Sequence, residues 1–182
     1  MVHTERFSIV DTETTGLRAS DNKIIEIAII NMNGSQIVEK FETLINPQRR
    51  ITPLISKITG IDNQMLLQAP PFFKVAKKII EMTQDRVFVA HNARFDFDFL
   101  QHEFSELGYN YQAQTHCTVR LARKAFPKET SYSLPKLTAS LGISHGKKHR
   151  AMGDALATAE LFKRIQSSLT QEIKGDQTLA PF

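Results

Sequence analysis

The sequence predicts one α/β domain in which helices pack on a mixed sheet. Its first 45 residues contain three runs typical of β-strands, at 6–11, 24–33 and 35–45, and Asn33-Gly34 between the last two is a strong hairpin signal. After residue 71, helical patterns alternate with short apolar runs. Consecutive strands followed by strands that alternate with helices are typical of an α/β layer fold.

The later elements are bounded by proline and glycine. Asn46-Pro47 ends the opening sheet, and residues 48–71 look irregular with short helical turns. The run 69–71, Ala-Pro-Pro, introduces the first long helix, and a glycine or a proline follows the end of three later ones. Helices are expected at 72–83, 93–107, 119–126, 133–142 and 151–173, and two further strands at 86–91 and 115–119.

Composition narrows the class of protein. A length of 182 residues predicts one domain, which we expect to cover 1–172, with 173–182 as a flexible tail. The apolar fraction of 41% argues against intrinsic disorder, and a single cysteine excludes a disulfide-stapled module. There is no signal peptide and no apolar run of about 18 residues, so we expect a soluble, cytoplasmic protein. A net charge of +4 permits a polyanionic partner without demonstrating one.

Two acidic residues follow the first strand pattern. Because the side-chain period of a strand is two, Asp11 and Glu13 leave the same face as Phe7 and Ile9 if the strand continues. Two carboxylates on a core-facing side would repel each other unless a cation lay between them. The alternative is that the strand ends at Val10 and that both acids face water in a turn.

A third acid lies at the start of the helix expected at 93–107. Helical spacing places Asp96 on the face of Leu100, Phe104 and Leu107, whereas Asp98 falls on the polar side. Asp96 is therefore the inward acid, although a charge in the first turn could instead complement the helix dipole. The preceding His91 and Asn92 are interpreted as hydrogen-bonding loop residues rather than metal ligands.

The last long helix begins beside a histidine and an acid. His149 lies just before this helix and Asp154 in its first turn, so one helix start could present an imidazole and a carboxylate to the same pocket. Lys147, Lys148 and Arg150 make the segment basic, which suits a phosphate group, but such a run is more often a solvated face. A histidine near an aspartate is often structural.

Taken together, these segments supply mainly oxygen ligands. Oxygen donors favour Mg²⁺ or Mn²⁺, and no cysteine and histidine spacing typical of zinc occurs. Four carboxylates carry about four negative charges, which two divalent cations would neutralise. No glycine-rich phosphate loop and no serine-nucleophile motif is present. Cys117 lies in an apolar segment and is not expected to act as a nucleophile.

Three motifs carry a family resemblance. FSIVDTETTGL, VAHNARFDFDFL and HRAMGDALATAELF, in this order, resemble the exonuclease motifs of the DEDD superfamily in its histidine-containing branch. The group that contains the proofreading epsilon subunit of bacterial DNA polymerase III is most similar. The resemblance covers about residues 6–168 and implies an RNase H-like fold, with a mixed five-stranded sheet and helices on both faces. At Cys117-Thr118 the chain departs from an Asp-Thr pair that is frequent in relatives.

The resemblance also implies roles for individual residues. Two divalent cations, Mg²⁺ or Mn²⁺, would be held by the four acids, and a histidine would act as general base. The implied catalytic residues are Asp11, Glu13, Asp96, His149 and Asp154, of which the four acids bind metal. The implied substrate-binding residues are Thr12, Thr14, Gly16, Leu17, Asn92 and Phe95.

The function implied is 3′-5′ hydrolysis of single-stranded DNA to nucleoside 5′-monophosphates, as in polymerase proofreading. An RNA-trimming enzyme would have the same motifs, and a non-catalytic module that binds nucleic acid or a polymerase is a further alternative. A DNA polymerase subunit and the sliding clamp are possible partners. The C-terminal QTLAPF loosely resembles clamp-binding peptides, so peptide 173–182 is a candidate clamp ligand, with a frayed terminus as the alternative.

Overall fold

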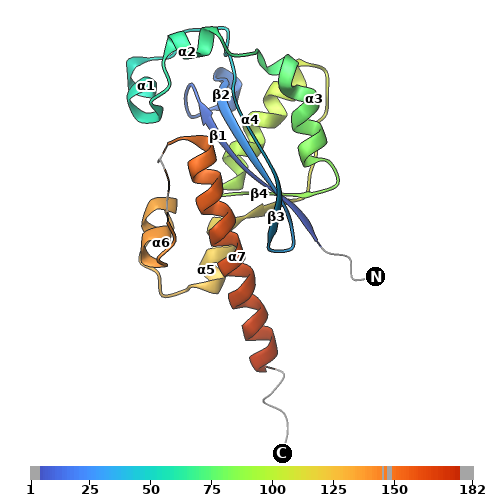
Figure 1. Cartoon of the computed structure of the whole chain (residues 1–182), viewed down its shortest axis with the longest axis vertical. Helices are drawn as coiled ribbons and strands as arrows, with labels where there is room; N and C mark the ends of the chain where they lie inside the picture. Colours follow the sequence, from blue (N-terminus) through green and yellow to red (C-terminus); the bar gives the residue numbers. More distant parts are fainter. Residues whose placement is uncertain (1–4, 145, 147–148, 177–182) are drawn as a thin grey trace, which may run out of the picture.

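The computed structural model describes residues 5–144, 146 and 149–176. Five strands and seven α-helices are found within these residues (Figure 1). The strands are β1 (Arg6–Thr14), β2 (Ile24–Asn33), β3 (Gln36–Leu44), β4 (Val87–Ala90) and β5 (Thr115–Cys117). The helices are α1 (Pro53–Thr59), α2 (Asn63–Leu67), α3 (Phe72–Thr83), α4 (Ala93–Glu106), α5 (Thr118–Ala125), α6 (Leu134–Ser140) and α7 (Ala151–Asp176), with a 3₁₀ turn η1 at Ala19–Asp21.

The strands form one mixed sheet in the order β3-β2-β1-β4-β5. The first three strands pair antiparallel, whereas β1, β4 and β5 are parallel. The hairpin between β2 and β3 turns at Gly34, whose φ of 56° is the left-handed conformation that glycine adopts without strain. Because β1, β4 and β5 run in the same direction, their carboxyl ends meet at one edge of the sheet.

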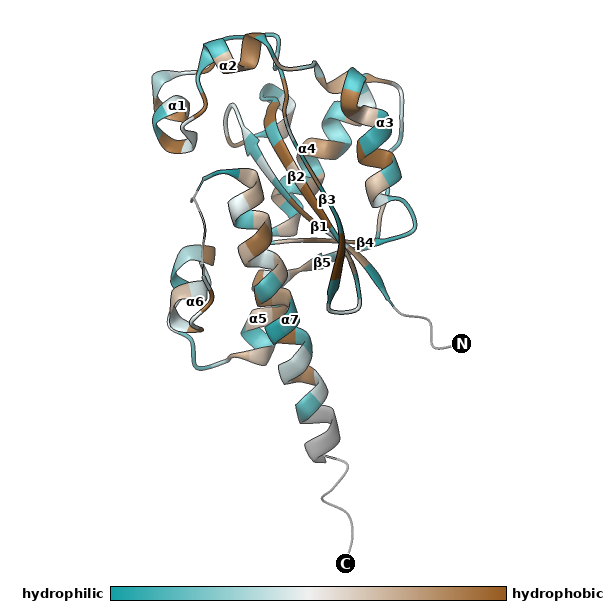
Figure 2. Cartoon of the chain, viewed as in Figure 1, coloured by the Kyte–Doolittle hydropathy of each residue, from teal (hydrophilic) through white to brown (hydrophobic). Residues whose placement is uncertain are grey.

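Helices cover both faces of the sheet. On one face α3 and α4 pack on alternate strand residues such as Val10 and Phe88. On the other face α7 packs its Ala151, Ala155 and Phe162 against Phe7 and its neighbours. Because β2 lies between the two layers, it is apolar along most of its length (Figure 2). A smaller cluster below α1 and α2 covers one end of this strand.

The α/β class, the mixed five-stranded sheet and the two helical layers confirm the architecture predicted from the sequence. Most element bounds differ from the expected ones by one to three residues, and the ends of β1 and α7 are among them. Strand β1 continues to Thr14 rather than ending at residue 11, because β2 pairs with it along its whole length. Helix α7 begins at Ala151 as expected and continues to Asp176, past the expected end at 173. The division into a domain at 1–172 and a tail stays a prediction.

None of the helices among the described residues has the length and apolar character needed to cross a membrane.

Candidate active site

The candidate site lies at the carboxyl edge of the parallel strands. Because β1 extends to Thr14, Asp11 and Glu13 are strand residues on one face, and the turn alternative is wrong. This face is the one that Phe7 and Ile9 present to α7. The two carboxylates therefore extend the apolar stripe of β1 up to the first turn of α7, as the period of two predicts.

Asp96 approaches the same strand from α4 on the opposite side of the sheet. The side chain is buried, with 4% of its surface exposed. Its Oδ1 accepts hydrogen bonds from the backbone N of Thr12 at 3.0 Å and from the Thr12 hydroxyl at 2.8 Å. Asp98 lies on the exposed side of α4 and pairs with Arg94 at 3.5 Å. The structure thus confirms the helical-face argument for an inward Asp96 and a solvated Asp98.

The start of α7 supplies the remaining groups. One potential ligand atom from each of Glu13, His149 and Asp154 lies within 4.8 Å of the other two. The Oδ2 of Asp154 accepts a hydrogen bond at 3.2 Å from the backbone N of His149, which holds the residue against the helix. His149 has a φ of 56° and an exposed side chain. The expected meeting of imidazole and carboxylate at one helix start is therefore present.

Burial raises the pKa values of Asp11, Glu13 and Asp96. Burial raises the pKa of Asp11 well above its ordinary value, and the negative charges of Asp96, Asp154 and Glu13 raise it further. Burial, followed by the charges of Asp154 and Glu26, raises the pKa of Glu13 to about 8. The pKa of Asp96 is raised to about 7 by burial, although the hydrogen bonds from Thr12 favour the ionised form. Such carboxylates resist ionisation together unless a cation is present.

These raised pKa values predict how stability depends on pH in metal-free buffer. The folded state keeps the Glu13 proton up to about pH 8, whereas the unfolded chain releases it near 4.5. Stability from this group is therefore full below pH 4.5 and is lost as the pH rises toward 8, by on the order of a few kcal/mol. Thermal unfolding in EDTA between pH 5 and 9 measures the loss. Glu13→Gln should flatten the profile, and an unchanged slope in this variant would refute the assignment.

A buried acid on β2 was not recognised in the sequence as part of the site. Glu26 is opposite Glu13 in the β1–β2 register and is fully buried. Its carboxylate accepts two hydrogen bonds from Arg150 Nε at 3.0 and 3.1 Å and one from Nη2 at 2.6 Å. It also accepts one from the backbone N of Ala151 at 2.8 Å, at the start of α7. Glu26 therefore fixes the segment that carries His149 to the centre of the sheet.

This pairing revises the interpretation of the basic run before α7. The Arg150 guanidinium is directed at Glu26 within the protein rather than at solvent or a phosphate group. Lys147 and Lys148, the other basic residues of that interpretation, lie outside the described residues. An apolar strand with one acid gives no sign in the sequence that its partner is 124 positions away.

Removing one partner of this ion pair is expected to destabilise the fold. Arg150→Met leaves the Glu26 carboxylate buried with only the Ala151 amide as a donor, which should cost about 3 kcal/mol of unfolding free energy. Urea unfolding at pH 7 measures this cost. The double variant Glu26→Gln/Arg150→Met removes the buried charge as well and should recover part of it. If adding Glu26→Gln to Arg150→Met lowered the free energy of unfolding by a further ~3 kcal/mol, the two residues would not act as a pair and this explanation would be wrong.

The last residue of β1 and the loop after it supply three of the implied substrate-binding residues. The Thr14 hydroxyl is buried and donates to the Gly16 carbonyl oxygen at 2.6 Å. Leu17 is 86% exposed, which suits an apolar contact with a ligand. A Cβ on Gly16 would lie 2.4 Å from the Asn22 side chain, so any larger residue would displace that amide. Thr12, in contrast, is buried and bound to Asp96, so its side chain positions an acid.

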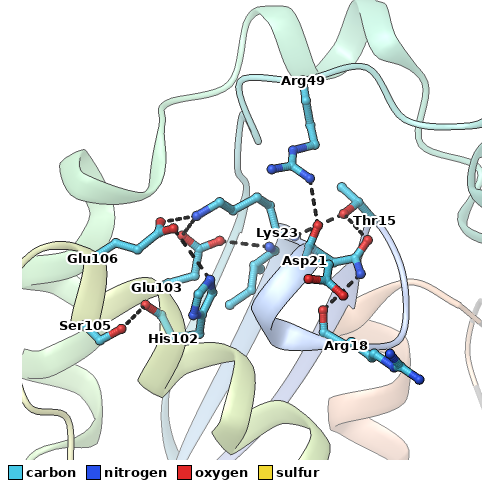
Figure 3. A network of polar contacts seen from close by, with 11 residues as sticks. Thr15, Arg18, Asp21, Lys23, Arg49, His102, Glu103, Ser105 and Glu106 are labelled. Carbon is cyan, nitrogen blue, oxygen red and sulfur yellow. Dashed lines mark hydrogen bonds and ion pairs between the residues drawn. The ribbon is translucent and has the colours of Figure 1, made fainter.

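A polar network holds this loop in place (Figure 3). Lys23 forms ion pairs with Glu103 and Glu106 of α4, and Glu103 also accepts the Ile24 amide at 3.0 Å. On the outer side of the loop, Arg49 donates to the Asp21 carbonyl oxygen at 2.8 Å. The exposed Leu17 is therefore presented on a loop that is fixed to α4 through Lys23 and to the segment after β3 through Asp21.

The remaining implied substrate residues lie at the start of α4. Asn92 is exposed and precedes the helix with a φ of 72°, in the left-handed region that asparagine tolerates. Phe95 is half-buried and packs against Phe99, with ring centroids 5.0 Å apart. The ring of His91 contacts the Thr118 hydroxyl and the Tyr132 carbonyl oxygen at 2.9 Å each, as expected for a structural loop histidine. The QTLAPF sequence at 177–182 lies outside the described residues.

The donor set fits divalent cations. Three buried or half-buried carboxylates with raised pKa values and a further acid at a helix start are hard oxygen ligands, which Mg²⁺ and Mn²⁺ prefer. The group formed by Glu13, His149 and Asp154 could hold one ion by itself. Asp11 is near both this group and Asp96, because the negative charges of Asp96, Asp154 and Glu13 all raise its pKa.

A carboxylate cluster at the carboxyl edge of a mixed sheet, joined by a histidine at a helix start, is a candidate site for a divalent metal ion. The chain belongs to the exonuclease family, whose model matches residues 8–162. This membership confirms the DEDD resemblance.

Individual relatives agree with this assignment. The chain is 37% identical over 169 residues to the 3′-5′ exonuclease DinG of Bacillus subtilis and 38% identical over 167 residues to the PolC-type DNA polymerase III of Caldanaerobacter subterraneus. Each match covers 92% of this chain but only 18% and 12% of the relative, so the chain spans less than a fifth of either protein.

Solved structures agree on the fold. Exonuclease X in complex with 5′ overhanging duplex DNA matches with a TM-score of 0.74 and 29% identity, over 89% of this chain and 92% of that chain. Escherichia coli exonuclease I in complex with a dT13 oligonucleotide matches with a TM-score of 0.81 over 93% of this chain and 43% of that chain. At 21% identity, the second likeness concerns the fold alone.

Proposed function

We propose that the chain is a metal-dependent 3′-5′ exonuclease that hydrolyses the 3′ ends of single-stranded DNA to nucleoside 5′-monophosphates. The observation that carries this proposal is the convergence of the carboxylates of Asp11, Glu13, Asp96 and Asp154 from three elements, with His149 at the same edge. Repulsion among four neighbouring acids destabilises the protein without metal. A cluster of this kind is therefore expected to bind a ligand of positive charge.

Each acid has a distinct place in the proposed chemistry. Asp11, Glu13 and Asp154 would hold one divalent cation, and Asp11 would share the second with Asp96. Such ions lower the pKa of an attacking water and stabilise the negative charge on a leaving 3′-oxygen. Thr12 orients Asp96 through two hydrogen bonds. Both are accepted by Oδ1, so neither occupies Oδ2 of Asp96.

His149 is proposed as the general base. Its ring lies beside Glu13 and Asp154, so a water held by these acids would be within reach of the imidazole. The side chain is exposed, which lets the accepted proton pass to solvent. The backbone at this residue is fixed by Asp154 and, through Arg150, by Glu26.

A single-stranded 3′ end is the proposed substrate because exposed side chains lie on the segment that follows Glu13 and on the one that precedes Asp96. Leu17 on the loop after β1 and Asn92 and Phe95 at the start of α4 would contact the terminal nucleotide. These contacts are to the base surface and backbone and do not read base edges, so little sequence preference is expected. The named activity of the B. subtilis relative and the dT13 complex of exonuclease I support this substrate class.

Proofreading alongside a DNA polymerase is the proposed setting. The similarity to a PolC-type polymerase supports it, because the matched region is a small part of that much longer protein. A polymerase subunit or the sliding clamp would then be a partner. Co-purification of the chain with a replicative polymerase from its own source would test this setting separately from the chemistry.

End-labelled oligonucleotides test the activity directly. With Mg²⁺ or Mn²⁺, a 3′-labelled single strand should release labelled mononucleotide at once, whereas the same strand labelled at its 5′ end should shorten one nucleotide at a time. EDTA should stop both reactions. Release of mononucleotide from the 5′ end first, or cleavage that continues in EDTA, would contradict the proposal.

A matched RNA strand decides between the two nucleic acids, since RNA differs only in its 2′-hydroxyl and in thymine methyl groups. We expect DNA to be cleaved faster. Faster cleavage of RNA would favour the RNA-trimming alternative, and binding of both strands without any cleavage would favour the non-catalytic module.

A further inference from the structure

A second feature of the surface is a groove along the edge strand β5, between α4 and α5. Its cavity has a volume of about 560 Å³. The floor is formed by alternate residues of the β5 segment, Ala113, Thr115 and Cys117, which share one face because the strand period is two. Phe97 of α4 and Val119 at the start of α5 complete an apolar lining. None of the residues proposed as catalytic lines this groove.

The rim of the groove is positively charged. Arg94 stands on the α4 side, and Arg120 and Arg123 stand on the α5 side, all exposed. Arg94 pairs weakly with Asp98, the one acid of the lining, at 3.5 Å. The Arg123 guanidinium lies over the Tyr132 ring, 5.4 Å from its centroid. Among the described residues, no hydrogen bond or ion pair engages the Arg120 side chain.

The groove begins next to the candidate active site. In the parallel register, Ile9 pairs with Val89 and Ala90 pairs with Cys117, so β4 and β5 end at the same level, and Asp11 lies just beyond this level on the longer strand β1. Asn92, two residues beyond the end of β4, lines the groove at this edge. From there the floor runs back along β5 and continues to Ala113, two residues before the strand. The groove thus leads away from the acids.

We propose that this groove binds the phosphodiester backbone of the substrate strand on the 5′ side of the nucleotide being removed. The inference rests on the proposed function and adds a second binding region to it. Three arginines facing one acid complement a polyanion, and the apolar floor with Phe97 can receive bases that stack without sequence preference. Binding here would hold long strands more tightly than short ones.

Binding measurements on strands of two lengths test the groove. Fluorescence anisotropy of labelled dT3 and dT12 is followed with Ca²⁺ in place of Mg²⁺, between 50 and 200 mM salt. Arg94→Gln/Arg120→Gln removes one cation from each rim while keeping Arg123 over its ring. The matched control Lys74→Gln/Lys77→Gln removes two exposed cations from α3, where Lys77 pairs with Glu81 as Arg94 pairs with Asp98.

The groove variant should raise the Kd of dT12 by about tenfold at physiological salt, because two phosphate contacts are lost. The slope of log Kd against log salt should become shallower by about 1.4, that is about 0.7 for each contact. The Kd of dT3 should change by less than about twofold, and the control should resemble wild type for both strands.

Equal effects of the groove variant and the control, or equal effects on dT3 and dT12, would overturn the inference. The proposed function fails by a different result. A protein that binds dT12 through the groove but releases no mononucleotide with Mg²⁺ or Mn²⁺ would keep the groove and lose the nuclease. Cleavage of short and long strands at the same rate would instead support the nuclease and exclude the groove.

Discussion

Asp96→Asn is expected to abolish hydrolysis while leaving the protein folded. Asparagine has nearly the same shape, and its carbonyl oxygen can still accept the two hydrogen bonds from Thr12. The substitution also removes a buried group whose pKa is raised to about 7, so the folded state loses no favourable charge interaction at neutral pH. The loss of one charged ligand from a two-cation site should lower the rate on the order of 10³-fold or more.

Asp98→Asn is the matched control because it makes the same chemical change two residues away on the same helix. Asp98 is exposed and pairs with Arg94, far from the acid cluster in its helical phase. At saturating substrate, where binding in a neighbouring groove does not limit the rate, the cleavage rate of this variant should therefore stay within about twofold of wild type. Single-turnover cleavage of a labelled strand and thermal unfolding of both variants give the two readouts. Equal losses of activity in the two variants would show that the face of α4 has been assigned incorrectly.

Replacement of His149 should slow the reaction strongly and leave metal binding almost unchanged. The suitable substitution is asparagine, since the residue has a φ of 56° and asparagine tolerates that region better than alanine does. A general base contributes typically 10²–10⁴-fold, and a decrease of this size is expected in the single-turnover rate at saturating Mg²⁺ or Mn²⁺. The acids that bind the ions remain in place.

Two further variants distinguish a catalytic role of His149 from a structural or metal-binding one. His102→Asn changes a partly buried histidine on α4 whose ring pairs with Glu106, and it should keep the wild-type rate. Asp154→Asn should instead weaken metal binding, so its rate should recover as the metal concentration rises. If His149→Asn recovered in the same way, the imidazole would be a ligand rather than a base. A rate near that of wild type would remove it from the mechanism altogether.

Much of the site was predictable because it depends on periodicity within single elements. The period of two placed Asp11 and Glu13 on one face, and helical spacing separated Asp96 from Asp98. Each argument needs only the type of element and its phase, which the apolar residues around the acids provide. The motif order then predicted that the three segments meet.

The contacts that hold the segments together could not be predicted from the sequence in the same way. Glu26 lies in a run that is apolar on both sides, as expected for a strand buried between two layers, so its charge had no visible role before its partner was known. Arg150 lies in a basic run, and such a run is typical of a solvated surface or of a phosphate-binding segment. Only the β1–β2 register and the position of α7 bring the two within 2.6 Å. Thr12 is similar, since its bond to Asp96 depends on how α4 docks on the sheet.

The central claim is that Asp11, Glu13, Asp96 and Asp154 together hold two divalent cations. Anomalous diffraction from crystals grown with Mn²⁺ and a nucleoside 5′-monophosphate tests it most directly. The account predicts two manganese peaks about 3.5–4 Å apart, the usual separation in two-metal sites, with Asp11 as a ligand of both and Asp96 as a ligand of one. A single peak held by Glu13, His149 and Asp154 alone, or no peak near Asp11, would contradict it.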